Sequence, residues 1–160
     1  SKVAAEAVSM SYYVTHNVPV TIFRLWKPYG PYDNGVVGIF ITRALKNEDL
    51  VVNNGGVDTT DFLYTEDLCD ATELALRKEE AIGQAFNIGL GVETSILDLA
   101  RIIVRLVGSS SNIKVQPQTS EPFRSYPDIS KAMRVLGFKP KYDLVSGLRT
   151  TIDWFKANTL

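Results

Sequence analysis

The fold class of this chain is decided by the run Val18-Pro19-Val20-Thr21-Ile22-Phe23-Arg24-Leu25, which is almost continuously apolar. It is short, and several of its residues are β-branched. Such a run is typical of a strand that is buried on both faces of a parallel sheet. Pro28-Tyr29-Gly30-Pro31 follows and predicts a loop, because prolines and a glycine interrupt regular structure there.

Residues 1–16, which precede this strand, predict a helix. Val3, Ala7, Met10 and Val14 recur at helical spacing, and neighbouring apolar residues widen their stripe. So wide a stripe favours burial against two neighbours, for instance the core and a partner subunit. The helical pattern already runs at Ser1, and no initiator methionine precedes it. We therefore expect a cut inside a longer protein, although a processed or engineered start would look the same.

Helices and strands alternate along the rest of the chain, which predicts an α/β fold. Further helices are expected over 36–46, 66–78, 96–107, 129–136 and 144–156, and strands over 50–52, 61–64, 85–88 and 113–115. Thr65 and Ser95 are the predicted N-caps of two of these helices, with Asp98 completing a capping-box pattern.

Composition excludes several classes of protein. Of the 160 residues, 17 are basic and 18 acidic, so the net charge of −1 gives no reason to expect nucleic acid or an anionic membrane as partner. The one cysteine, Cys69, excludes an intrachain disulfide, and no Cys/His cluster predicts a metal site. No apolar run approaches the roughly 20 residues of a membrane span. No signal peptide is visible, and we expect a cytoplasmic protein.

Five segments carry a resemblance to a known family, and they span nearly all of the chain. They are Ser1-Lys2-Val3-Ala4-Ala5-Glu6, Arg24-Leu25-Trp26-Lys27-Pro28-Tyr29-Gly30-Pro31, Asp61-Phe62-Leu63-Tyr64-Thr65-Glu66-Asp67, Phe86-Asn87-Ile88-Gly89 and Tyr126-Pro127-Asp128-Ile129-Ser130-Lys131-Ala132. In this order they resemble motifs of the extended short-chain dehydrogenase/reductase family, the NAD-dependent epimerases and dehydratases. The first resembles the end of the Tyr-x-x-x-Lys motif of that family.

The resemblance covers only the C-terminal half of such an enzyme. It implies the C-terminal part of a Rossmann-type parallel sheet plus a small α/β substrate-binding domain. Residues 1–35 would be the last part of the Rossmann-like domain. Residues 36–160 would be mainly substrate-binding domain, with a strand near 85–88 returning to the sheet. The family usually dimerises through the helix that starts at its catalytic lysine, so a homodimer through helix 1–16 is expected.

Lys2 is the catalytic residue that the resemblance implies. In the family this lysine binds the nicotinamide ribose and lowers the pKa of a tyrosine four residues earlier, which exchanges a proton with the sugar hydroxyl. That tyrosine and a glycine-rich pyrophosphate loop are absent from these 160 residues. Lys2, Leu25, Trp26, Pro28 and Tyr29 are the predicted contacts to NAD or NADP in the parent enzyme. This chain alone is expected to bind no cofactor.

The substrate side departs from the family pattern at three positions. Lys27 stands where many relatives have a sugar-contacting Asn, and Thr60 and Gln118 stand where arginines often bind the nucleotide diphosphate. Neither Thr nor Gln supplies the planar cation that suits a diphosphate. Arg124 or Lys27 compensates from another direction, or the substrate is not a typical nucleotide sugar. The predicted substrate contacts are Lys27, Asn53, Thr60, Phe62, Gln118 and Arg124.

Three hypotheses about function therefore stay open. The first is the C-terminal portion of an NAD(P)-dependent nucleotide-sugar epimerase or dehydratase that acts by transient hydride transfer. The second is a short, non-catalytic binding or interaction protein derived from the family. The third is a reductase or dehydrogenase that acts on a non-nucleotide substrate.

Overall fold

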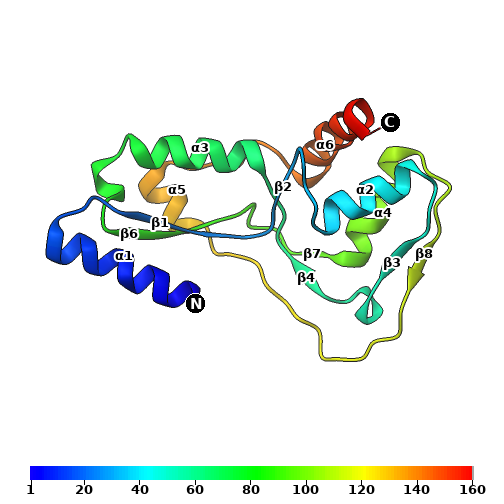
Figure 1. Ribbon diagram of the computed structural model, residues 1–160, viewed down its shortest axis with the longest axis horizontal. Helices are drawn as coiled ribbons and strands as arrows, with labels where there is room; N and C mark the ends of the chain where they lie inside the picture. Colours follow the sequence, from blue (N-terminus) through cyan, green and yellow to red (C-terminus); the bar gives the residue numbers. More distant parts are fainter. Residues whose placement is uncertain (160) are drawn as a thin grey trace.

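Two parallel strands from distant parts of the chain form the pair on which the fold is built. β1 (Thr21–Leu25) pairs with β6 (Gln84–Ile88), with Thr21 opposite Gln84 and Leu25 opposite Ile88. The structure is a computed structural model, and it describes residues 1–159. In Figure 1, α1 (Lys2–His16) lies on one side of the pair, and α3 (Thr65–Leu76) and α5 (Ser130–Leu136) lie on the other. The predicted α/β class and the strand at 85–88 are confirmed.

A first core lies between this strand pair and the helices α3 and α5, and we call this part the sheet lobe. Phe86, at the centre of β6, is fully buried, and its ring meets that of Phe23 edge-on with centroids 6.4 Å apart. The buried members of this core are Leu63, Ala71, Ala81, Phe86, Ile88, Ala132, Leu136 and Phe138.

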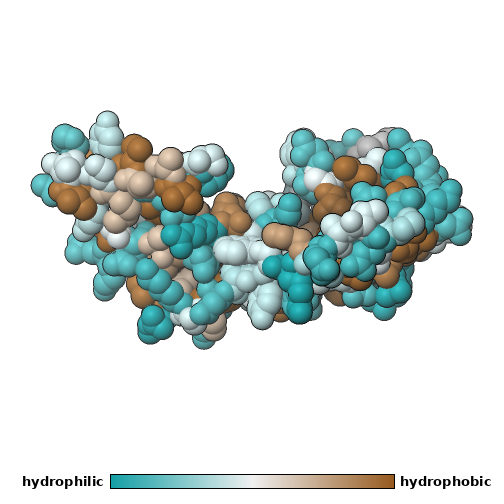
Figure 2. Space-filling view, turned by 90° about the horizontal axis from the view of Figure 1, so that it is seen from below, coloured by the Kyte–Doolittle hydropathy of each residue, from teal (hydrophilic) through white to brown (hydrophobic). Residues whose placement is uncertain are grey.

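A second core is built from α2 (Val36–Leu45), α4 (Ile96–Val107) and α6 (Leu144–Thr159), and we call this part the helical lobe. Two short strand pairs flank it. β3 (Leu50–Val52) runs parallel to β8 (Ile113–Val115), and β4 (Thr59–Thr60) runs antiparallel to β7 (Thr94–Ser95). Figure 2 shows the two lobes as separate masses joined by a narrower middle.

Short elements connect the lobes. β2 (Pro28–Tyr29) pairs in parallel with β5 (Leu63–Tyr64), and single turns of 3-10 helix cover Asn54–Gly56 and Glu79–Ala81. Helices from the middle and end of the chain contribute to both cores, so each core uses residues from beyond position 35. The division at residue 35 stays a prediction.

The helices begin and end within three residues of their predicted bounds. Of the two predicted N-caps, one is confirmed and the other is wrong. Ser95 Oγ accepts the Asp98 N–H at 3.0 Å, which confirms the predicted cap. The prediction for Thr65 is wrong, because Thr65 is the first helical residue and Tyr64 is the N-cap. Its side chain packs against Gly30 instead, where an added Cβ would collide with Thr65 Oγ1. No helix in the described part of the chain has the length and apolar content that crossing a membrane requires.

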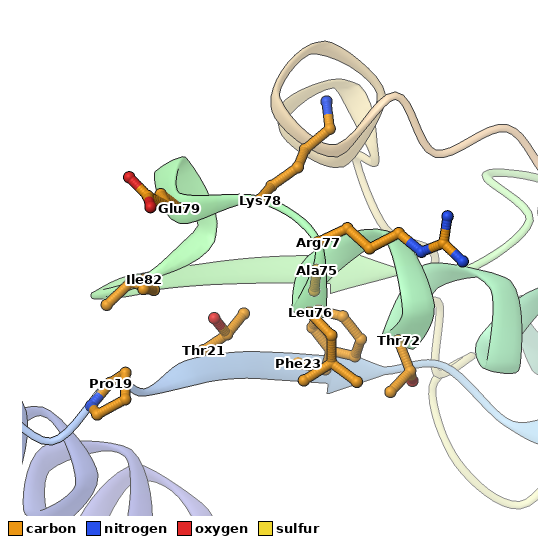
Figure 3. Close-up of a pocket in the computed structure, with 10 residues that line it drawn as sticks. All are labelled: Pro19, Thr21, Phe23, Thr72, Ala75, Leu76, Arg77, Lys78, Glu79 and Ile82. Carbon is orange, nitrogen blue, oxygen red and sulfur yellow. The ribbon is translucent and has the colours of Figure 1, made fainter.

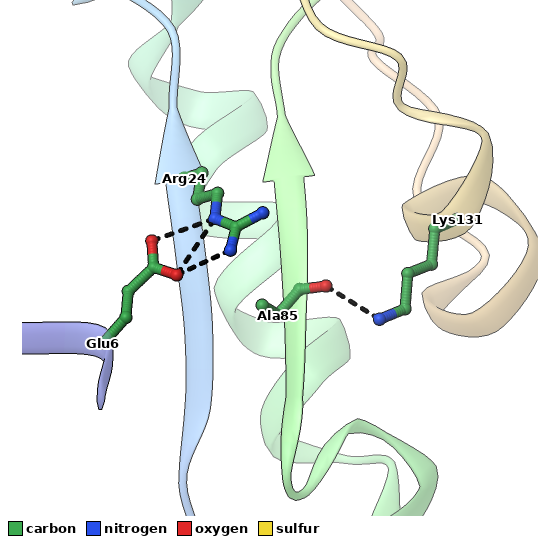
Figure 4. A network of polar contacts seen from close by, with 4 residues as sticks. All are labelled: Glu6, Arg24, Ala85 and Lys131. Carbon is green, nitrogen blue, oxygen red and sulfur yellow. Dashed lines mark hydrogen bonds and ion pairs between the residues drawn. The ribbon is translucent and has the colours of Figure 1, made fainter. Parts of the chain in front are cut away.

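The two edges of the strand pair differ. α5 covers the β6 edge, where Lys131 Nζ donates to the Ala85 carbonyl at 2.9 Å (Figure 4). Among residues 1–159, β6 is the only strand that pairs with β1. Beside the other edge of β1 lies a hollow of about 680 Å³, to which Pro19, Phe23 and Leu76 contribute apolar side chains (Figure 3).

The carboxylate of Asp61 links two segments at the centre of the molecule by hydrogen bonds. Asp61 is fully buried and accepts N–H bonds from Leu90 at 2.8 Å, Gly91 at 2.5 Å and Val92 at 2.9 Å. Burial raises the pKa of this carboxyl, and the three hydrogen bonds oppose that rise. The turn after β6 is thereby held against the segment that precedes β5.

Replacing Asp61 by alanine should destabilise the protein strongly. Three buried N–H donors would lose their acceptor, and we expect a loss of roughly 3 to 5 kcal/mol in the free energy of unfolding. Urea-induced unfolding measures this loss. The exposed Asp153, replaced by alanine, is the control and should change stability by less than about 0.5 kcal/mol. Equal effects of the two variants would contradict the assigned role.

Candidate functional site

An ion pair positions the N-terminus of α1 beside the carboxyl end of β1. Glu6 accepts two bonds from Arg24 Nε, at 2.9 and 3.1 Å, and one from Arg24 Nη2 at 2.6 Å (Figure 4). These bonds lower the pKa of Glu6 and raise that of Arg24. Lys2 lies one turn before Glu6 and lines a hollow of about 570 Å³ that also includes Leu25 and Trp26. The predicted catalytic lysine therefore lies at the end of β1.

The other predicted cofactor contacts divide between this hollow and the core. Leu25 is 43% exposed, and the Trp26 indole Nε1–H donates to Ser125 Oγ at 2.8 Å. Pro28 and Tyr29 lie beyond the hollow. Tyr29 is 2% exposed, its hydroxyl donates to the Leu144 carbonyl at 3.3 Å, and burial raises its pKa far above the ordinary value. The Tyr29 side chain thus belongs to the core of the helical lobe.

The structure does not bring all predicted substrate contacts together. Phe62 is 2% exposed, and its ring meets that of Tyr29 edge-on. Thr60 is 6% exposed in β4. Asn53 and Gln118 lie on the surface, and Gln118 Nε2 donates to the Ser120 carbonyl at 3.0 Å. These positions remain predictions of substrate contact.

Arg124 lies on residues 116–129, an extended segment that we call the strap. The Thr59 N–H donates to the Phe123 carbonyl at 2.9 Å, and the Ser125 N–H donates to the Thr59 carbonyl at 3.3 Å. Arg124 is thereby placed opposite β4, next to the Thr60 position where the resemblance implies a diphosphate arginine. The strap therefore places the Arg124 guanidinium near Thr60, which stands where the resemblance implies an arginine.

This guanidinium is already engaged. Arg124 Nε donates to Glu93 Oε1 and Arg124 Nη2 donates to Glu93 Oε2, both at 2.7 Å, and the Thr59 hydroxyl donates to Glu93 at 2.5 Å. The hydrogen bond and charge of Arg124 lower the pKa of Glu93 to about 2. One edge of the guanidinium is therefore neutralised, while 68% of the Arg124 side chain stays exposed.

Two further side chains hold the strap, and no sequence pattern predicted this role. Asn54 Oδ1 accepts the N–H groups of Thr119 and Ser120, both at 3.0 Å. Asp58 Oδ1 accepts the Phe123 N–H at 2.9 Å. Neither Asn54 nor Glu93 is among the predicted substrate or cofactor contacts. All three residues act on partners 31 to 66 positions away, where no local pattern exists.

Lys27 connects the two lobes and has a free side chain. It follows β1, is exposed, and its carbonyl accepts the Leu63 N–H at 3.3 Å. It lines a small hollow of about 130 Å³ together with residues at the start of α2. Asp67, Asn87 and Asp128 have structural roles, since each bonds backbone groups of loops or helix starts.

Comparisons with known proteins agree with this architecture. The model of the NAD dependent epimerase/dehydratase family matches residues 1–89. UDP-glucuronic acid decarboxylase 2 of Arabidopsis thaliana is 34% identical over 160 residues, which covers 97% of this chain and 36% of that protein. The chain thus spans about a third of the length of this relative.

Solved structures match over nearly the whole chain. The structure of UDP-glucose 4-epimerase from Thermotoga maritima with UDP-glucose has a TM-score of 0.91 at 28% identity, covering 99% of this chain and 53% of that one. The structure of UDP-glucuronic acid 4-epimerase from Bacillus cereus with UDP-glucuronic acid and NAD has a TM-score of 0.87 at 29% identity, covering 98% and 51%. The chain spans about half of each of these proteins.

Replacing Glu93 by glutamine should loosen the strap. The loss of one charge-assisted pair should make the amides of Thr59 and Ser125 exchange their hydrogens roughly fivefold faster.

The same pair should make the stability of the strap depend on pH. Because the pKa of Glu93 is lowered, the contribution of Glu93 to that stability is complete above pH 4.5 and is lost as the pH falls through about 2. Hydrogen exchange followed by mass spectrometry measures both effects. Glu48→Gln, an exposed and distant change, should leave exchange in the strap unaltered, and equal exchange in both variants would refute the coupling.

Proposed function

This chain belongs to the NAD dependent epimerase/dehydratase family, and we propose that it forms the C-terminal, substrate-binding part of an enzyme that modifies a nucleotide sugar. The enzyme would work by transient hydride transfer with NAD or NADP. The named relatives act on or bind UDP-sugars, and one is solved with NAD. A cytoplasmic location belongs to the same proposal, and the exposed free thiol of Cys69 is compatible with it.

The observation that carries this proposal is the place of Lys2. In open sheets with parallel strands, ligands bind in the crevice outside the carboxyl ends of the strands. The Glu6–Arg24 pair puts Lys2 at that end of β1. Lys2 makes no ion pair among residues 1–159, so its ammonium group is available to a ligand.

The residues at this end suit one part of a dinucleotide. The Lys2 ammonium would donate to ribose hydroxyls, and the exposed Leu25 offers an apolar surface to a nicotinamide ring. When bound, the dinucleotide accepts and returns a hydride. Lys2 would also lower the pKa of a phenol placed beside it, because a nearby cation favours the phenolate. The 160 residues contain no glycine-rich loop for the pyrophosphate.

The edges of the strand pair support the place of this chain in a larger sheet. α5 and Lys131 close the β6 edge, whereas β1 has an unpaired edge with apolar side chains beside it. A parallel strand could therefore add at β1 only. In this proposal β1 and β6 are the last two strands of a Rossmann-type sheet, and the helical lobe is the main part of the substrate-binding domain.

One observation favours a second candidate, a reductase or dehydrogenase that acts on a non-nucleotide substrate. Thr60 and Gln118 carry no charge, and Glu93 neutralises Arg124. A site that has no free arginine is poorly suited to a diphosphate. Titration of the complete natural protein with UDP separates the two candidates, since only the nucleotide-sugar enzyme should bind it.

Replacing Lys2 by methionine in the complete natural protein should abolish most of the activity. We expect kcat to fall by roughly 100-fold or more, because proton transfer through the neighbouring phenol would lose its supporting cation. Binding of UDP-glucose should change little. Steady-state kinetics and calorimetry measure these quantities, and Lys46→Met at the exposed end of α2 is the matched control. An unchanged kcat in Lys2→Met would argue against the family mechanism.

A homodimer through α1 is part of the same proposal. None of the 15 residues of α1 is buried, and Val3, Val8 and Val14 are 81%, 58% and 72% exposed. Exposed apolar side chains along one helix mark a surface that another protein covers. A second copy of the same helix would bury the face of α1 that carries Val8 by a two-fold symmetric contact.

Introducing a charge at Val8 should dissociate this dimer. Val8→Asp would bury an unpaired carboxylate in the interface, so the sedimentation coefficient of the complete protein should shift to that of a monomer. Met133→Asp, a similar change at an exposed apolar residue on α5, should leave the dimer intact. A Val8→Asp protein that still sediments as a dimer would exclude α1 as the interface.

A further inference from the structure

The strap contacts both lobes, and each lobe holds a different part of it. It runs from β8 beside the helical lobe to α5 in the sheet lobe (Figure 1). Its first part is bonded to Asn54, Asp58 and Thr59, in the segment that leads from β3 into β4. Its last part reaches the sheet lobe, where the buried Pro127 lies so close to Gly89 that an added Cβ there would collide with it.

Arg124 and Ser125 are the consecutive residues at which the strap passes from one lobe to the other. A bridge to Thr59 keeps the strap extended here, and the Ser125 N–H donates to the Thr59 carbonyl at 3.3 Å. Successive side chains of an extended segment point in opposite directions. Arg124 accordingly pairs with Glu93, just before β7, whereas Ser125 Oγ accepts the Trp26 indole N–H at 2.8 Å, at the end of β1.

The indole that Ser125 holds forms part of the wall of the hollow at the end of β1. Trp26 lines this hollow of about 570 Å³ together with Lys2 and Leu25. The backbone of Trp26 is fixed separately, because its N–H donates to the Ile88 carbonyl at 3.2 Å. The side chain can still rotate, and a short hydrogen bond from the indole selects one orientation. A hydroxyl of the strap thus orients a side chain among the predicted cofactor contacts.

We propose that Ser125 is a positioning residue that acts through Trp26, and that the strap thereby couples the substrate side of the site to the cofactor side. This inference rests on the proposed function above. A ligand can reach Arg124, since 68% of its side chain is exposed. A ligand that moves Arg124 also moves the next residue, Ser125, and with it the indole. Substrate binding therefore adjusts the orientation of one side chain in the cofactor hollow.

The indole N–H signal of Trp26 reports this coupling without any turnover. In the NMR spectrum of the complete natural protein it is the indole signal that disappears in Trp26→Phe. Adding UDP should shift this signal. Ser125→Ala should move the signal of the free protein and abolish most of the shift with UDP, whereas Ser125→Thr, which keeps a hydroxyl, should restore both. Ser120→Ala removes an exposed hydroxyl from the same strap and is the matched control, which should behave as the natural protein.

Steady-state kinetics separate positioning from a contribution to strap stability. Ser125→Ala should lower kcat roughly fivefold, the effect of one lost hydrogen bond, and should change UDP affinity little. Trp26→Phe keeps an aromatic ring and loses the same bond. Adding Ser125→Ala to Trp26→Phe should therefore cause no further loss, because residues that act through one shared contact are not additive.

Other outcomes would overturn the proposal in distinguishable ways. If UDP bound and left the Trp26 signal in place, coupling would be excluded and the proposed function would stand. Additive losses in the double variant would show that Ser125 does not act through Trp26. Equal losses in Ser125→Ala and Ser120→Ala would reduce the bond to strap stability. If UDP did not bind, the proposed function itself would fail, and this inference with it.

Discussion

The carboxylate of Asp61 fixes the point at which the two cores of the molecule meet. Phe62 belongs to the core of the helical lobe and Leu63 to that of the sheet lobe, because successive side chains of an extended segment point in opposite directions. Asp61 holds this segment to the turn after β6 through three N–H bonds. Lys27, Thr60 and the strap are all placed relative to this junction, so the geometry of the candidate site depends on one buried acceptor.

The two kinds of cation in the site differ in what they can do. The Glu93 carboxylate fixes one edge of the Arg124 guanidinium, so Arg124 positions the strap and has little net charge to offer. Lysine is a point charge on a flexible stem, and it can follow a ligand. The free charges near β1 are both lysines. The arrangement therefore gives the strap a fixed cation, whereas the lysines near β1 have no ion-pair partner among residues 1–159.

The sequence predicted the features that repeat locally. The apolar run that contains β1, the helical stripe of α1 and the Ser95 cap are short-range patterns, and the structure confirms them. The role of Glu93 and the packing of Thr65 against Gly30 depend on partners 31 and 35 residues away, so no spacing rule could reveal them. The motif resemblance located Lys2 and Lys27, but whether each one forms an ion pair follows only from which carboxylates the fold brings near.

The position of Lys2 links catalysis to assembly. α1 is held to the sheet lobe by the Glu6–Arg24 pair, whose side chains are 26% and 52% exposed, and by Tyr13 against Gly83. An exposed ion pair is too weak to hold a whole helix rigidly. A surface that covers the exposed valines of α1 would supply the missing constraint. We therefore expect the geometry of Lys2 to become fixed only when α1 is covered, so that the site is complete only in the assembled protein.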